Sequence, residues 1–223
     1  MFGLRAARLA FHHPQTGVEV TIFPMVHIGE RQFYKRAYKD AFEHDVVLYE
    51  GVRTRRSKLI TASYRWLNLE RLGLVVQPSA AEFEGPARSV HADIAPEELR
   101  ALWQRMPLWL RALVAFGGPA FGMYGRFTAS RDSIAKGMTK DLLRDPDDIL
   151  DQGDEFEPLR DMISHARDRR LIETLTSELG AAAHSTRIAI VYGAGHVAPV
   201  VRALTRQGFS TRPSEWMTIF SLD

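Results

Sequence analysis

Cysteine is absent from this chain of 223 residues. Its absence excludes disulfide frameworks, zinc sites built from thiolates and cysteine nucleophiles. Any catalysis must therefore use histidine, carboxylates, hydroxyls, lysine, arginine or a metal held by nitrogen and oxygen ligands. A chain without cysteine is also compatible with a cytoplasmic location.

The chain has no strong excess of charge of either sign. Its 29 lysines and arginines face 27 aspartates and glutamates, for a net charge of +2. Such a balance does not require nucleic acid as a partner, and we expect none. The first residues lack the apolar core and cleavage site of a signal peptide. They instead have the pattern of a first strand, so we expect a cytoplasmic protein.

No uninterrupted apolar run matches the roughly 20 residues that a membrane span needs. The least charged long stretch covers 106–125 and contains Arg111, two prolines and several glycines. We expect a buried helix pair or a lid here. The same stretch is the place where we expect a subunit contact, as in a homodimer, or a peripheral contact with a bilayer.

Several common catalytic motifs are also missing. The chain has no Gly-x-Ser-x-Gly elbow, no His-Glu-x-x-His helix and no Gly-x-x-x-x-Gly-Lys loop. Serine hydrolases, zincins and P-loop nucleotide hydrolases therefore lack their usual signals.

Strand and helix patterns alternate at both ends of the chain. The first end predicts a hairpin, a helix and a buried strand, and the second predicts a strand, a helix and a last strand. The predicted ranges are 4–11, 18–26, 30–43 and 45–50, then 188–192, 197–207 and 216–220. We predict a single α/β domain over 1–223, with a mostly parallel central sheet built from two βαβ units. Between them, 58–185 is predicted as a mostly helical insert that caps the site.

A histidine ends one apolar strand in each of these two units. His27 follows the strand of the first unit, and His196 follows the strand of the second within Gly193-Ala-Gly195-His196. Ligands of open parallel sheets bind beyond the carboxyl ends of the strands. Glycines at that turn let the backbone approach a ligand. The two histidines are therefore predicted to share one site.

Charged residues offer further candidates for this site. Glu50 ends a buried strand, and we expect that strand to be the neighbour of the one carrying His27. An unpaired buried carboxylate is costly, so Glu50 is either a metal ligand or general base, or it pairs with an arginine such as Arg55. Arg167 is a candidate for holding an anion. The spacing of His91-Ala-Asp93 suits two side chains on one face.

A dinucleotide-binding fingerprint competes with this interpretation. Gly193 to Ala198 fits Gly-x-Gly-x-x-Ala after a strand, and Glu215 follows about 20 residues later. Only 25 residues remain after Ala198, too few for the other strands of a mononucleotide-binding half. The fingerprint also leaves His27 and Glu50 without a role.

The combined pattern resembles the TraB/PrgY/GumN family, which is related to the Tiki proteins and to the erythromycin esterase and ChaN superfamily. The resemblance rests on Pro24-Met-Val-His27, on Val46-Val-Leu-Tyr-Glu50 followed by Arg55, on Arg167-Asp168 and on Gly193-Ala-Gly-His196. It covers roughly 80 residues at the two ends. Pro24 departs from the pattern, because the first Gly-x-x-His motif of the family has glycine at that position.

The resemblance implies a metal-dependent hydrolase, most simply a peptidase, acting on a peptide or small-molecule substrate. His27, Glu50, Arg167 and His196 would be catalytic, and the first, second and last of these would hold a divalent Mn, Co or Zn ion. Substrate would contact Arg55, Asp93, Gly193 and Gly195, with Arg55 or Arg167 steadying the oxyanion. Two alternatives stay open: a non-catalytic peptide- or haem-binding protein, and an esterase-like hydrolase in which histidine is a general base without metal.

Overall fold

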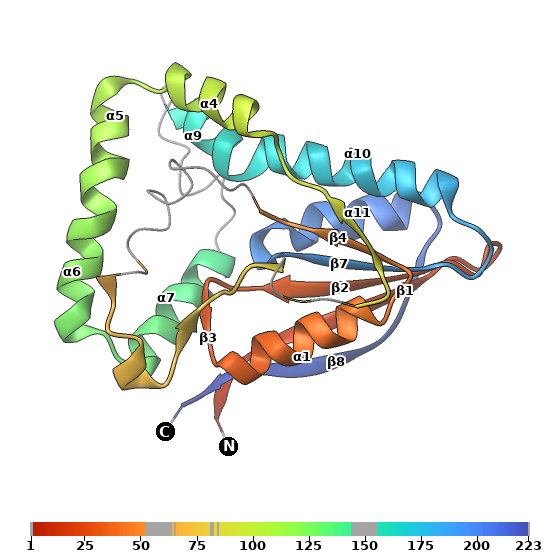
Figure 1. The fold of residues 1–223 in the computed structure, drawn as a ribbon, viewed down its shortest axis with the longest axis horizontal. Coiled ribbons are helices and arrows are strands. Elements are labelled where there is room, and N and C mark those ends of the chain that lie inside the picture. Colours follow the sequence, from red (N-terminus) through yellow and green to blue (C-terminus); the bar gives the residue numbers. More distant parts are fainter. Residues whose placement is uncertain are drawn as a thin grey trace.

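The computed structural model describes residues 2–51, 64, 66–80, 83, 85–143 and 156–222. Its strands are β1 (Gly3–His12), β2 (Glu19–Met25), β3 (Ile28–Gly29), β4 (Val46–Tyr49), β5 (Val75–Val76), β6 (Arg88–His91), β7 (Arg187–Gly193) and β8 (Ser210–Ser221). Its main helices are α1 (Arg31–Phe42), α4 (Pro96–Arg105), α5 (Leu108–Ala112), α6 (Gly118–Thr128), α7 (Arg131–Leu143), α9 (Glu157–Arg160), α10 (Ala166–Ala181) and α11 (Val197–Arg206). Figure 1 shows their arrangement.

The central sheet has the strand order β6-β4-β7-β2-β1-β8. The pairs β6–β4, β4–β7 and β7–β2 are parallel, whereas β1 is antiparallel to both of its neighbours. Of these strands, β1 alone runs against the others. The predicted α/β class with a mostly parallel sheet is therefore confirmed.

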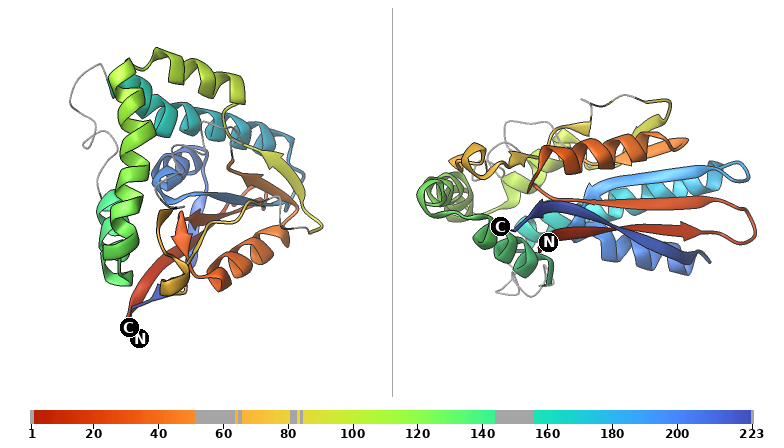
Figure 2. Two further views of the ribbon diagram at one scale, coloured as in Figure 1. Left: turned by 60° about the vertical axis from the view of Figure 1, so that its left-hand side comes forward. Right: turned by 90° about the horizontal axis from the view of Figure 1, so that it is seen from below.

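Alternating side chains of the sheet supply two cores, one on each face. On β7, Ile188, Ile190 and Tyr192 face the core that contains Leu171 of α10 and Leu204 of α11. The residues between them, Ala189 and Val191, belong to the other core, which α1 covers with Phe33, Tyr34 and Tyr38. The views in Figure 2 show α1 on one side of the sheet and α10 and α11 on the other.

The neighbour relation predicted for the first unit is wrong. β2 and β4 are joined by α1 but do not pair, because β7 from the far end of the chain lies between them. Propensity and spacing cannot reveal such an insertion, since either neighbour satisfies the same apolar pattern. The carboxyl ends of β2, β7 and β4 still meet at one edge, with β7 in the middle.

Pro24 occupies a place in β2 where its missing N–H costs little. The pairing of β2 with β1 ends at Ile22, so no antiparallel ladder continues past it on that side. On the other side, Pro24 lies in register with Tyr192 of β7. Proline is tolerated in a sheet at such places, where the ladder on one side has ended.

The segments between β4 and β7 serve several purposes. β6 extends the main sheet at its edge, and α10 packs on its face. α4 packs on the helix that begins at α9, through Leu99, Leu102 and Met162.

The residues predicted as a buried pair or lid instead form α5, a π-helical turn at Leu113–Gly117, and α6. This helical rod stands at one end of the molecule (Figure 1). Many of its large apolar side chains are exposed. No helix in the described residues has the length and hydropathy to cross a membrane.

Candidate functional site

Glu50 lies immediately after β4 and turns towards the adjoining end of β7. Its backbone N–H donates to the carbonyl of Val191 at 3.2 Å, which extends the parallel ladder by one residue. Its Oε2 accepts a hydrogen bond from the Gly193 N–H at 2.5 Å. A Cβ atom on Gly193 would lie 3.1 Å from that oxygen and 3.4 Å from Cδ2 of His196. Glycine at this turn therefore lets Glu50 and His196 approach each other.

Arg167 reaches this edge from α10 and binds two carboxylates. Its Nε and Nη2 donate to the two oxygens of Asp93 at 2.9 and 2.7 Å, and Nη2 also donates to Oε1 of Glu50. The guanidinium lies over the Tyr192 ring, 5.7 Å from its centroid. An arginine that binds one carboxylate through two nitrogens and also contacts a second carboxylate is held strongly and in a defined orientation. Nη1 has no hydrogen-bond partner among the residues that the structure describes.

The Asp93 side chain is fully buried, with an exposure of 0%. Besides Arg167, its oxygens accept hydrogen bonds from the backbone N–H groups of Gly51 and Ile94. His91, two residues earlier, contacts the carbonyl of Gly51 through Nε2 at 2.7 Å. Both side chains thus contact Gly51 and fasten the backbone that follows Glu50. Asp93 lies too deep to contact a substrate.

His196 ends a short 3-10 turn and is held by an acidic side chain. Its Nδ1 lies 2.6 Å from Oδ1 of Asp168, the residue that follows Arg167 on α10. The imidazole also packs edge-on against Tyr192, with ring centroids 4.9 Å apart. Only 11% of the His196 side chain is exposed. The carboxylate occupies one ring nitrogen, so Nε2 is the nitrogen left for chemistry.

His27, after β2, is held far less firmly. The residue is exposed to solvent, and neither ring nitrogen has a hydrogen-bond partner in the described part of the chain. The ring stacks on Tyr64, with centroids 5.0 Å apart. It still lies near enough to Glu50, Arg167 and His196 for their charges to act on it. Although solvent reaches the residue, the protein packed around the ring desolvates it in part, and this desolvation lowers the pKa of His27; Glu50 opposes this effect, and Arg167 and His196 add to it.

The carboxylates at this edge are held ionised by the cation between them. Burial alone would raise the pKa of Glu50, but Arg167 and His196 bring it below its usual value. Burial would likewise raise the pKa of Asp93, and the hydrogen bonds and charge of Arg167 lower it. Desolvation would lower the pKa of Arg167, but the two carboxylates hold it well above its ordinary value. The edge is therefore a network of three charged groups at neutral pH.

Four of the predicted site residues meet at this edge, namely His27, Glu50, Arg167 and His196. Gly193 joins them through its N–H, but Gly195 has open space where a Cβ would stand. Arg55 lies outside the described residues. Asp168 and Tyr192 were not predicted as site residues. The adjacency of Arg167 and Asp168 was the available signal, because one helix turn presents them to Glu50 and His196 respectively.

The predicted metal ligands fit a divalent cation only in part. His196 keeps a free Nε2 with Nδ1 on a carboxylate, which is the usual support of a metal-bound imidazole. Glu50, in contrast, has one oxygen on Arg167 and the other on the Gly193 amide. Among the described residues, no group of three or more histidines, aspartates and glutamates is arranged to hold an ion. Either oxygen of Glu50 would have to bind an ion beside the hydrogen-bond donor that it already contacts.

The dinucleotide fingerprint lacks its expected surroundings. In such folds the acidic residue ends a strand that runs parallel beside the glycine-rich turn's own strand. Here β8 pairs antiparallel with β1, and the two strands β2 and β1 separate β8 from β7. Glu215 forms ion pairs with Arg8 and Arg36. Glu215 therefore lies on β8, the outermost strand of the sheet, and not beside the glycine-rich turn.

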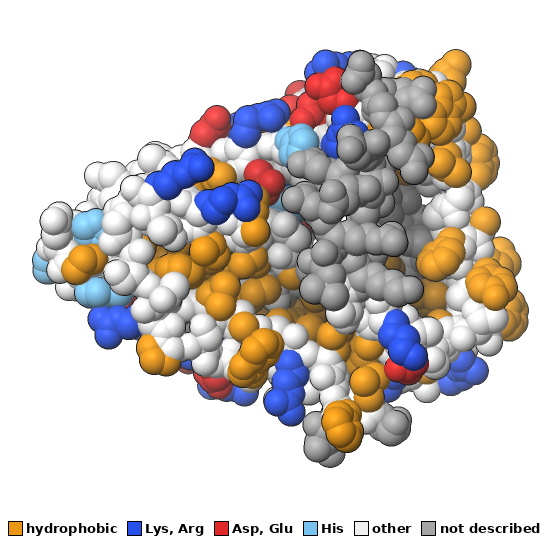
Figure 3. Space-filling view, turned by 180° about the vertical axis from the view of Figure 1, so that it is seen from behind, with side chains coloured by type: hydrophobic (Ala, Val, Ile, Leu, Met, Phe, Trp, Pro, Cys, Tyr) orange, Lys and Arg blue, Asp and Glu red, His pale blue; other side chains and the backbone are white. Residues whose placement is uncertain are grey.

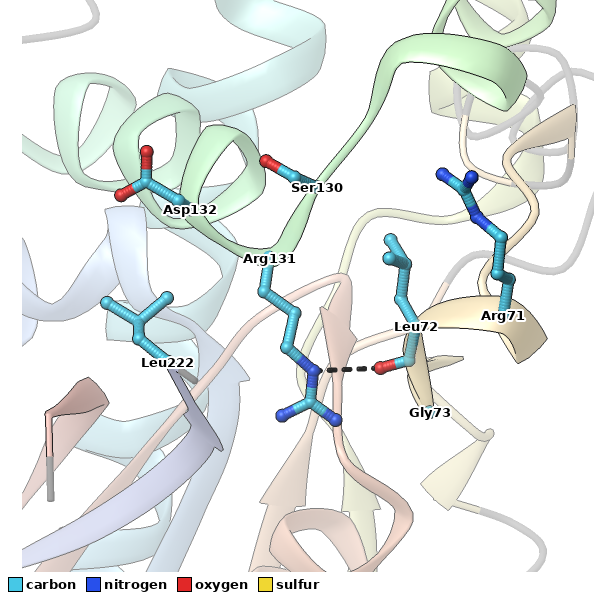
Figure 4. A pocket seen from close by; sticks show the side chains of 7 residues that line it. All are labelled: Arg71, Leu72, Gly73, Ser130, Arg131, Asp132 and Leu222. Carbon is cyan, nitrogen blue, oxygen red and sulfur yellow. Dashed lines mark hydrogen bonds between the residues drawn. The ribbon is translucent and has the colours of Figure 1, made fainter.

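One cavity, with a volume of about 640 Å³, lies away from these residues. It is lined by Arg71, Leu72, Gly73, Ser130, Arg131, Asp132 and Leu222 (Figure 4). Arg131 is already bound there, to the carbonyls of Leu72 and Ser221 and to the carboxylate of Glu30. We assign this cavity no function.

Comparisons with family models, with curated proteins and with solved structures found no match to this chain. The resemblance to the TraB/PrgY/GumN family therefore stays a prediction.

Proposed function

We propose that the protein is a hydrolase whose reactive group is the His196 imidazole oriented by Asp168. The observation that carries the proposal is the contact of 2.6 Å between Nδ1 and the carboxylate. It selects the tautomer with the lone pair on Nε2 and stabilises the ring once that nitrogen takes a proton. A base oriented in this way can activate water for attack on a carbonyl carbon.

The neighbouring groups suit the remaining needs of such a reaction. Nη1 of Arg167 is the donor left to stabilise negative charge on the carbonyl oxygen. Glu50 and Asp93 hold that guanidinium in place. The proton that His196 takes from water then passes to the leaving group, and His27, kept neutral by its lowered pKa, suits accepting a hydrogen bond from the substrate. We propose a peptide or a small ester as substrate and a cytoplasmic location.

A metal-dependent peptidase is the second candidate. The free ring nitrogens of His27 and His196 at one sheet edge favour it, and Glu50 is the carboxylate that would join them. A bound divalent cation would polarise the carbonyl and acidify water. Both candidates depend on His196, so a single set of variants tests them together.

The test is hydrolysis by the full chain, dialysed against chelator, of a fluorogenic peptide library and of nitrophenyl esters. Each assay is run with and without added Mn²⁺, Co²⁺ or Zn²⁺. We expect turnover, with losses of about 10²–10⁴-fold in both His196→Gln and Asp168→Asn. Arg169→Ala is the matched control, because that exposed arginine of the same helix points away from the network.

Activity that survives chelation supports the metal-free hydrolase, whereas activity that needs an added ion, with the ion's binding lost in His196→Gln, supports the peptidase. Full activity of His196→Gln would overturn both. Tight haem or peptide binding by a folded protein that turns over no substrate would favour the non-catalytic binding protein.

A further inference from the structure

The helical rod formed by α5, the π-helical turn and α6 (residues 108–128) exposes an unusual number of large apolar side chains. Those of the rod that are 47–78% exposed are Leu108, Trp109, Leu113, Phe116, Phe121, Met123, Tyr124 and Phe127. Figure 3 shows orange side chains gathered along the edge of the molecule where α5 and α6 lie. Exposed apolar patches of this extent on a folded protein mark surfaces that bind something.

The side of α6 that faces the protein carries its smallest residues. Gly122 and Gly125 are the buried residues of this helix. A Cβ atom on Gly125 would lie 2.5 Å from Cδ2 of Leu67, so the helix packs there through its bare backbone. An ordinary surface helix buries its large apolar side chains. Here close packing on glycine fixes the helix with its aromatic residues outward.

The charge of this region has one sign only. Residues 99–131 contain five arginines and no aspartate or glutamate. Arg100, Arg105 and Arg126 are exposed and form no ion pair with the described residues. Arg111 instead donates to the carbonyls of Met106 and Gln104. The exposed apolar surface is therefore flanked by cations that nothing in the described chain neutralises.

We propose that the rod is a membrane-binding surface that lies on an anionic lipid bilayer. Tryptophan, tyrosine and phenylalanine are the side chains that settle at the boundary between headgroups and acyl chains. Arginines beside them are attracted to acidic headgroups. One face of the rod stays packed on the protein through Gly122 and Gly125, so only the opposite face enters the lipid. A second copy of the chain fits less well, because a symmetric contact would bring two arginine sets together.

The test is co-sedimentation of the full chain with vesicles of phosphatidylcholine alone and of phosphatidylcholine mixed with phosphatidylglycerol. We expect binding to the mixed vesicles that weakens with salt. Removing two exposed aromatic side chains, in Phe121→Ser with Phe127→Ser, should weaken binding by about thirtyfold or more. Arg105→Gln with Arg126→Gln should weaken it about fivefold per arginine, and only for the anionic vesicles.

Trp216→Ser is the matched control, because this side chain is 64% exposed on β8, outside the rod. It should bind as the unaltered chain does. Trp109→Phe adds a readout that keeps the apolar surface intact, since it should remove most of the quenching by brominated lipids. No binding of the unaltered chain to mixed vesicles would overturn the proposal. So would a dimer without lipid that Phe121→Ser with Phe127→Ser converts to a monomer, because the surface would then belong to a second copy.

Discussion

The ends of β7 and β2 each carry a histidine, yet the two are held in opposite ways. His196 is nearly buried, with Asp168 on Nδ1 and Tyr192 against its ring. His27 is exposed, and within the described part of the chain its ring stacks on Tyr64 and its nitrogens have no hydrogen-bond partner. The difference follows from strand order, because β7 lies between β4 and β2 and receives partners from both neighbours and from α10. We infer that the end of β7 is preorganised and the end of β2 is adjustable.

Removing the cation of the network should show most strongly how the β7 end is held together. Arg167→Met leaves Glu50 and Asp93 buried without their partner. We expect a loss of about 3–5 kcal/mol in the free energy of unfolding, measured by urea denaturation. Arg169→Ala, at a side chain 63% exposed, should change it by less than about 0.5 kcal/mol. A loss below about 1 kcal/mol in Arg167→Met would show that the network does not stabilise this edge.

The two histidines themselves give the next contrast. His196→Ala removes a hydrogen bond to a carboxylate and a buried ring contact, so we expect a loss of about 1.5–3 kcal/mol. His27→Ala removes an exposed ring stacked on Tyr64 and should cost less than about 1 kcal/mol. Thermal and urea unfolding measure both. Equal losses would contradict the comparison between the two strand ends.

Alanine substitutions at two glycines of the same turn should change stability less, and they can be compared directly. Gly193→Ala places a Cβ 3.1 Å from a carboxylate oxygen of Glu50, so the carboxylate or the turn must shift. We expect a loss of about 1–3 kcal/mol. Gly195→Ala meets none of the described residues within 4 Å and should be close to neutral. If Gly195→Ala is the more damaging substitution, the turn differs from the one described.

The smallest expected effect is on stability at acidic pH, which should decrease in two separate steps as the pH falls. The pKa of His27 is lower in the folded chain than the ordinary 6.5, so the unfolded chain binds more protons as pH falls below neutrality. Stability should therefore decrease from about pH 7 downward. Glu50 and Asp93, also with lowered pKa values, add a second decrease below about pH 5.

His27→Gln should reduce the first decrease and keep the second, as measured by urea unfolding across pH. The part of the first decrease that remains comes from His44, whose pKa is also lowered by desolvation. The sign is the same for both steps, because each group is held in its deprotonated form by folding. Stability that rises on acidification through either range would show that the sign assigned to these groups is wrong.

Local patterns in the sequence determined much of the fold. Apolar alternation located β2, β4 and β7 to within a few residues, and α1 and α11 lie where helical spacing placed them. Gly208, just after α11, has a φ of +87°, a conformation that glycine adopts readily. The histidines after β2 and β7 and the glutamate after β4 could be recognised because parallel strands bring their carboxyl ends to one edge.

Tertiary structure alone decided which groups meet at that edge. The insertion of β7 between β2 and β4 leaves no local trace, since a buried strand looks the same beside either neighbour. Whether Glu50 faces an arginine, and whether Asp168 or a metal supports His196, depends on how α10 lies across the sheet. The outward face of α6 was equally hidden, because apolar residues favour burial wherever packing allows it. The packed side of that helix carries Gly122 and Gly125, the second of them against Leu67, and its aromatic side therefore lies outside.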